Sequence, residues 1–185
     1  MDRVRHDAIV LAGGGSTRFG RDKLAAVVDG ATLLDRVLSA AAAAGQRIVV
    51  GSPRPVDGAV RWTLEDPPGG GPAAGVVAGL DLVHASWVLL LAGDLPYVSA
   101  GTFTRLLEAG ARGDGALLVD EAGRRQLLCS AVRADALRER AGSREDWHGC
   151  SLRSLLDGLR LVEVPAVAEE AHDVDLPDDL PQEAR

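Results

Sequence analysis

The stretch Leu11–Lys23 reads LAGGGSTRFGRDK, and the rest of the chain is organised around it. It follows an apolar run, Ala8–Leu11, whose length and β-branched residues are typical of a buried strand. Glycines at positions 13, 14, 15 and 20 free the backbone for positive φ angles and for close approach to a ligand. Hydroxyl and cationic residues lie among them: Ser16, Thr17, Arg18, Arg21 and Lys23. A loop with these groups at the carboxyl end of a strand is suited to binding a polyphosphate.

Two familiar glycine-rich phosphate loops do not match this stretch. Gly15 and Gly20 have the spacing of the P-loop, but Arg21 and Asp22 follow, so the hydroxyl that would bind magnesium is missing. The dinucleotide-binding fingerprint fails as well, because Arg18 stands where its third glycine would be. The loop is therefore of a third kind.

The rest of the chain surrounds this loop with alternating strand and helix patterns. Over roughly the first 110 residues they alternate four times, which is typical of a doubly wound, mainly parallel sheet with its ligand loops at the carboxyl ends of the strands. We expect one α/β domain over residues 1–185. The predicted strands are Ala8–Leu11, Arg47–Val50, Arg61–Glu65 and Trp87–Leu91, and the predicted helices begin after Thr32, at Ala73 and after Ser99.

The later part of the chain is less regular. A small antiparallel hairpin is predicted from the strand patterns Gly115–Val119 and Leu127–Val132, joined by the turn Asp120–Arg125. We expect this hairpin to be an excursion, apart from the main sheet. Short helices are predicted at Asp135–Ala141 and Leu152–Leu156, and a late strand at Leu159–Val164.

Composition excludes several classes of function. The formal net charge is −7, and no basic stripe or aromatic platform is available to hold a strand of nucleic acid. No apolar segment approaches membrane-spanning length, and the polar start Met1–Arg3 is not a signal peptide. Cys129 and Cys150 are too few for a disulfide framework or a zinc site. We therefore expect a cytoplasmic protein that binds neither nucleic acid nor membrane.

Asp94 is the sharpest single candidate for a metal ligand. It follows the most apolar strand of the sequence, where a carboxylate is costly unless it is solvated, paired or bound to a metal. Magnesium prefers one or two carboxylates together with phosphate oxygens and water. With the glycine loop on a neighbouring strand end, Asp94 is predicted to bind Mg²⁺.

The pattern Leu-Ala-Gly-Gly-x-Ser-x-Arg-x-Gly-x-Asp-Lys resembles the signature loop of Rossmann-like nucleotidyltransferases, and most of all that of the molybdenum cofactor guanylyltransferases. Gly93–Pro96 resembles the family motif Gly-Asp-x-Pro, whose aspartate holds magnesium, and that role carries onto Asp94. Gly71–Gly75, GPAAG, resembles the family's Gly-Pro-Leu-Ala-Gly. The resemblance runs nearly end to end and is strongest before residue 100.

The resemblance implies transfer of GMP from GTP to the terminal phosphate of molybdopterin. Lys23, Arg18 and Mg²⁺ at Asp94 would neutralise charge and position the phosphates, and no general base is needed. Molybdoenzymes and other cofactor-synthesis proteins are the implied partners. The predicted nucleotide-binding residues are Leu11, Ala12, Gly13, Gly14, Gly15, Ser16, Arg18, Lys23, Asp66 and Asp94.

Asp66 is the candidate for recognising guanine, since a carboxylate can accept hydrogen bonds from both the N1–H and the 2-amino group. The resemblance implies an acidic residue at the end of this strand, where Glu65 and Asp66 stand. Asp173 and Asp175 are available as secondary metal or substrate ligands, and the polar loop Gly142–Gly149 as a pterin-binding segment.

Two departures from the family pattern concern the acceptor side and the chain end. Leu127 stands in Gln126–Leu128 where the family has proline, and Leu176 replaces a threonine near the end. Two other functions stay open: a related transferase with another base or acceptor, such as a molybdopterin cytidylyltransferase, and a non-catalytic nucleotide-binding adaptor. An adaptor would not need a metal ligand, which argues against it.

Overall fold

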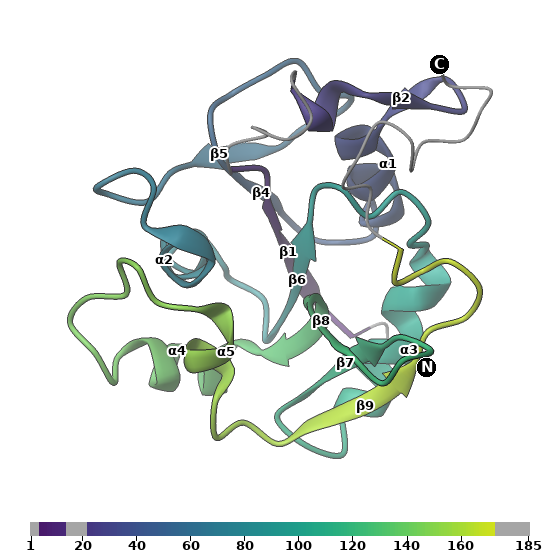
Figure 1. Ribbon diagram of the computed structural model, residues 1–185. Coiled ribbons are helices and arrows are strands. Elements are labelled where there is room, and N and C mark those ends of the chain that lie inside the picture. The colour runs from purple at the N-terminus through teal and green to yellow at the C-terminus, as the bar shows by residue number, and fades with distance from the viewer. Residues whose placement is uncertain (1–3, 14–21, 173–185) are drawn as a thin grey trace.

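The computed structural model describes residues 4–13 and 22–172, and a mainly parallel sheet runs through the middle of this part (Figure 1). Among the described residues the sheet has seven strands in the order β5-β4-β1-β6-β8-β7-β9. Of these, β8 runs antiparallel to both neighbours and the other pairs are parallel. The α/β class and the doubly wound arrangement are confirmed. The strands are β1 (His6–Leu11), β4 (Arg47–Val50), β5 (Arg61–Thr63), β6 (Trp87–Ala92), β7 (Gly115–Val119), β8 (Arg125–Arg133) and β9 (Leu161–Pro165).

Helices cover both faces of the sheet, which explains why the central strands are apolar on both sides. In Figure 1 the helices α1 (Leu33–Ala40) and α3 (Ala100–Gly110) lie on one face, and α2 (Gly71–Leu80), α4 (Ala134–Ala141) and α5 (Leu152–Leu156) lie on the other. Each face has its own buried cluster. Residues of β6 alternate between the clusters, with Leu89 and Leu91 in one and Val88 and Leu90 in the other.

Local signals set where two of these helices begin. The Thr32 hydroxyl accepts from the backbone N–H of Asp35, and Ser99 forms a capping box with Thr102. The predicted starts after Thr32 and after Ser99 are confirmed. Helix α2 begins at Gly71 and ends at Leu80, so the predicted start at Ala73 is two residues too late.

The late hairpin is antiparallel, as predicted, but the expectation of an excursion is wrong. Strand β8 enters the main sheet between β6 and β7, with Leu89 opposite Ala131. The register of β7 with β8 shifts between Leu117 and Leu118, which leaves Leu127–Cys129 as an irregular stretch. A small second sheet pairs β2 (Val27–Val28) with β3 (Ala31–Thr32).

Within the part of the chain that the structure describes, no helix has the length and apolar character needed to cross a membrane. A single nucleotidyltransferase domain over residues 1–185 stays a prediction.

Candidate functional site

The carboxyl ends of four parallel strands converge on one edge of the sheet and are tied to one another by backbone hydrogen bonds. The N–H of Gly93, after β6, donates to the carbonyl of Leu11 at 3.0 Å. The N–H of Ala12 donates to Val50 at 2.8 Å, and that of Gly51 to Thr63 at 2.9 Å. These bonds fix the starting point of each loop that carries a candidate residue. The structure therefore brings the loops at the carboxyl ends of these strands together, as the sequence predicted.

Lys23 and Asp94 meet at this edge. The Nζ of Lys23 lies 2.7 Å from Oδ2 of Asp94, with side chains 13% and 23% exposed. Lys23 begins the short 3₁₀ helix η1 (Lys23–Ala25), and Asp94 stands two residues beyond β6. The predicted phosphate-binding cation and the predicted metal ligand are thus neighbours. Lys23 is also the only lysine among the 20 lysines and arginines of the chain.

The glycine loop is described at its two ends. Leu11 is half-buried, Ala12 is buried and Gly13 is exposed, which leaves the backbone of Gly13 accessible at the sheet edge. The predicted residues Gly14, Gly15, Ser16 and Arg18 lie outside the described residues, as do Asp173 and Asp175. Their roles stay predictions.

Arg54 was missed by sequence reasoning. It belongs to the loop after β4, and its Nη1 lies 2.7 and 2.6 Å from the two carboxylate oxygens of Asp22. Its Nη2 donates to the carbonyl of Ala12 at 3.4 Å. The sequence feature that could have pointed to Arg54 was a cationic residue on a loop at the carboxyl end of a strand. A single charged side chain in such a loop is usually only solvated. The structure places it between the two ends of the glycine loop.

The acidic pair after β5 separates into two environments. Asp66 is exposed, whereas Glu65 is half-buried and accepts a hydrogen bond from the N–H of Gly69 at 3.0 Å. Glu65 also lies near Gly75 in the first turns of α2. Asp66 keeps a carboxylate available to a ligand, and Glu65 is a second acidic group at the same place that sequence reasoning did not select.

The predicted pterin segment Gly142–Gly149 reaches the site from the other side of α2. Trp147 is buried, and its Nε1 donates to the carbonyl of Ala141 at 2.8 Å. The N–H of Gly149 donates to the carbonyl of Gly70 at 2.8 Å. The end of this segment therefore rests against the residues that precede α2, beside the acidic pair.

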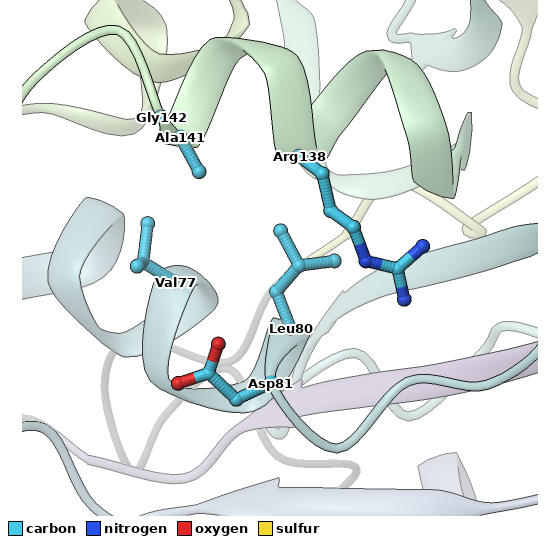
Figure 2. Close-up of a pocket in the computed structure, with 6 residues that line it drawn as sticks. All are labelled: Val77, Leu80, Asp81, Arg138, Ala141 and Gly142. Carbon is cyan, nitrogen blue, oxygen red and sulfur yellow. The ribbon is translucent and has the colours of Figure 1, made fainter.

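A cavity of about 390 Å³ lies between α2 and α4 but is not part of this site (Figure 2). Val77 and Leu80 of α2 face Ala141 of α4 across it, with Asp81 and Arg138 at its border. It adjoins the carboxyl-terminal end of α2, whereas the candidate site lies at the amino-terminal end of that helix. Of the predicted pterin segment, only its first residue, Gly142, lines this cavity.

The end of the described chain lies beside the Asp94 loop. The rings of His172 and Tyr97 have centroids 6.1 Å apart, and Tyr97 stands three residues after Asp94. Glu170 is 8% exposed and accepts hydrogen bonds from Thr102 and Arg105 of α3 and from the N–H of Val167. Burial alone would raise the pKa of Glu170, but these hydrogen bonds outweigh it and leave that pKa below its ordinary value.

The described residues hold no group of three or more His, Cys, Asp or Glu side chains that could bind a metal. The partly exposed carboxylate of Asp94 has the chemistry of a single protein ligand for a hard cation that takes its other oxygens from phosphates and water. That donor set suits magnesium and does not suit zinc, which takes three or four protein ligands.

The comparisons with known proteins agree with this arrangement. A family model described as the MobA-like NTP transferase domain matches residues 8–164. A "Probable molybdenum cofactor guanylyltransferase" from Bacillus cereus (strain ATCC 10987 / NRS 248) is 37% identical over 131 residues, which are 66% of this chain and 66% of that protein. The matched part is just under two thirds of the relative's length.

Two solved structures share the fold. "Molybdopterin-guanine dinucleotide biosynthesis protein A" from Archaeoglobus fulgidus has a TM-score of 0.69 at 21% identity, over 94% of each chain. "2-C-methyl-D-erythritol 4-phosphate cytidylyltransferase" from Thermus thermophilus has a TM-score of 0.68 at 21% identity, over 94% of this chain and 95% of that one. Because both match equally well, the fold does not select a base. The family match over residues 8–164, together with the site at the sheet edge, shows that this chain belongs to the MobA-like NTP transferase family and is a nucleotidyltransferase.

Proposed function

We propose that this protein is a molybdenum cofactor guanylyltransferase, which transfers GMP from GTP to the terminal phosphate of molybdopterin and releases pyrophosphate. The observation that carries the proposal is the contact between Lys23 and Asp94, 2.7 Å apart at the edge where the glycine loop begins. It puts a cation for phosphate oxygens beside a carboxylate suited to magnesium. The name of the Bacillus cereus relative supports the choice of substrates.

The reaction forms one P–O bond and breaks another. An oxygen of the acceptor phosphate attacks the α-phosphorus of GTP in line, and the bond from that phosphorus to the oxygen bridging the β-phosphate breaks. A phosphate monoester has a second pKa of about 6, so it is largely a dianion at neutral pH and needs no general base. Lys23 stabilises the charge that moves onto the pyrophosphate, and Arg18 is proposed to assist.

The bound triphosphate brings the negative charge that competes for Lys23. The ammonium of Lys23 is paired with Asp94 in the structure. We propose that phosphate oxygens would accept the Lys23 ammonium and that the Asp94 carboxylate would hold Mg²⁺. The cation supplies charge neutralisation and orientation of the phosphates.

The base is proposed to be read by Asp66. Its exposed carboxylate can accept from the N1–H and the 2-amino group of guanine together, which neither cytosine nor uracil can offer. Glu65 already accepts from the N–H of Gly69, so it is the less available of the two.

Location and partners complete the proposal. Both cysteines are free thiols, which fits a reducing cytoplasm. Molybdoenzymes or other cofactor-synthesis proteins would receive the product.

The proposal is tested by incubating the purified protein with molybdopterin, Mg²⁺ and each of the four ribonucleoside triphosphates in turn, and measuring pyrophosphate release. We expect release with GTP that depends on molybdopterin. Release with CTP instead would establish a cytidylyltransferase, and nucleotide binding without release would establish an adaptor.

The matched variant for this assay is Lys23→Ala. We expect turnover to fall about 100-fold or more, because the variant lacks the ammonium that stabilises negative charge in the transition state. Circular dichroism should show an unchanged fold. A Lys23→Ala protein with near-parent turnover would remove Lys23 from the mechanism.

A further inference from the structure

The side chain of Arg54 joins the two described ends of the glycine loop. Its guanidinium contacts Asp22 through Nη1 and the carbonyl of Ala12 through Nη2. Ala12 precedes the segment Gly13–Arg21 in the chain, and Asp22 follows it. One cation therefore fixes the separation between the strand that enters the loop and the turn that leaves it. The Arg54 side chain is 22% exposed, and its buried Nε has no hydrogen-bond partner among the described residues.

The backbone that carries Arg54 is held against Ala12 independently of this side chain. Gly51 has a φ of +149°, and a Cβ there would lie 2.9 Å from both the carbonyl carbon and oxygen of Ala12. Only glycine permits that approach. The loop after β4 is thus a fixed base from which Arg54 reaches Asp22.

Asp22 transmits this contact to Lys23. Its Oδ1 accepts the N–H of Leu24 at 3.2 Å and caps η1, while the same oxygen accepts from Arg54. Lys23 is the first residue of that capped turn, and its ammonium meets Asp94. Contacts therefore run from Arg54 through Asp22 and the turn to the Lys23–Asp94 pair.

We propose that Arg54 is a positioning residue for Lys23: by holding Asp22, it keeps the turn in the orientation that presents the Lys23 ammonium to Asp94 and to bound phosphates. This inference rests on the proposed function only where it gives Lys23 a role in catalysis. That Arg54 holds the position of the Lys23 ammonium does not depend on which reaction the protein catalyses. Arg54 contacts Asp22, the residue next to Lys23, through a two-oxygen ion pair, and this contact is the route by which it acts on Lys23.

The first test reads the position of Lys23 without any turnover. Because Lys23 is the only lysine, an amine-acetylating reagent modifies one side chain, and the α-amino group of the same molecule serves as the internal reference. In Arg54→Met and Asp22→Asn we expect the ratio of Lys23 labelling to α-amine labelling to rise about two- to fivefold, as for a weakened partly exposed ion pair. Peptide mass spectrometry measures both rates.

The matched control is Arg160→Met, which breaks the ion pair of Arg160 with Asp114 just before β7, at the opposite edge of the sheet, where Nη2 and Oδ1 lie 3.3 Å apart. Its labelling ratio should equal that of the parent protein. An unchanged ratio in Arg54→Met would overturn the proposal, and so would an equal rise in the control.

The second test uses steady-state kinetics with GTP and molybdopterin. A misplaced Lys23 loses its transition-state contacts first, so we expect kcat of Arg54→Met to fall about tenfold or more while KM for GTP stays within about threefold. The double variant with Asp22→Asn should be no worse than the worse single variant, because both changes break one connection. A change in KM alone, or additive losses, would contradict the positioning role.

Failure of the proposed function is distinguishable from failure of this inference. A parent protein that releases no pyrophosphate overturns the proposed function, while the labelling ratio still decides whether Arg54 positions Lys23.

Discussion

At the scale of the residue, the charge of Asp94 is met in the structure by the ammonium of Lys23, and both side chains keep some contact with solvent. We expect Asp94→Asn to lower turnover about 100-fold or more, because an amide holds magnesium poorly while keeping the shape of the carboxylate. The free energy of unfolding should change by only about 1 kcal/mol, as is usual for partly exposed ion pairs. Turnover measured against magnesium concentration, with calorimetric GTP binding alongside, checks this. An unchanged magnesium dependence would show that the metal is held elsewhere.

Asp66 can be tested through the 2-amino group that distinguishes GTP from ITP. In Asp66→Ala, GTP loses two hydrogen bonds and ITP loses one, so the preference for GTP in kcat/KM should shrink about tenfold or more. Glu65→Gln is the matched control, since it keeps an acceptor for Gly69 and removes the neighbouring charge. If GTP and ITP lose equally in Asp66→Ala, the 2-amino group is read by another part of the site.

At the scale of the element, the segment after β9 is attached to α3 by Glu170. The carboxylate is buried and bonded to Thr102, Arg105 and the N–H of Val167. We expect Glu170→Gln to lower the free energy of unfolding by about 1–3 kcal/mol, because hydrogen bonds to a charged group are lost. The midpoint of thermal unfolding should fall by roughly 2–4 °C for each kcal/mol. Glu163→Gln, which breaks an exposed pair with Arg125, is the control and should change little.

The same variant has a defined pH dependence. Since the pKa of Glu170 is lowered in the folded protein, its stabilisation is present above the unfolded pKa and is lost as pH falls through the folded one. The stability difference between the parent protein and Glu170→Gln should therefore shrink on acidification. Chemical denaturation at a series of acidic pH values measures it, and a difference that grows in acid would contradict the assignment.

Sequence reasoning succeeded where the determining interactions are local. Thr32 and Ser99 cap their helices through residues three positions away, so each start can be read from a few residues. The placement of the glycine loop and of Asp94 at one edge followed from one general rule, that carboxyl ends of parallel strands share an edge, whereas the direct contact between Lys23 and Asp94 was not predicted.

Sequence reasoning failed where the structure depends on contacts between segments far apart in the chain. The place of β8 in the sheet depends on its pairing with β6, about forty residues earlier in the chain. The apolar pattern of a strand does not show which other strand it pairs with. Arg54 was missed because its partners, Ala12 and Asp22, lie more than thirty residues away. Strand β5 ends at Thr63 rather than at Glu65, so strand alternation could not separate the environments of Glu65 and Asp66.

At the scale of the whole molecule, Cys129 reports on the integrity of the core. It is fully buried on β8, and burial, with a further contribution from Glu170, raises the pKa of its thiol to about 12. The thiolate is the reactive form, so we expect a disulfide-exchange reagent to modify Cys150 first and Cys129 only when the protein unfolds. The slow labelling rate should match unfolding followed by circular dichroism, and Cys150→Ser should lack the fast phase. Two rapidly reacting thiols in native buffer would contradict this.

The position of β8 has a consequence for synthesis on the ribosome. Residues up to Ala92 contain all four strands of the block β5-β4-β1-β6, but one edge of β6 is covered only by β8, which ends at Arg133. While the intervening residues are being added, the nascent chain presents the open edge of its most apolar strand. Such an edge is a template for pairing with other chains. Fragments that stop between α3 and β8 should therefore aggregate, whereas the full chain closes the edge with its own antiparallel strand.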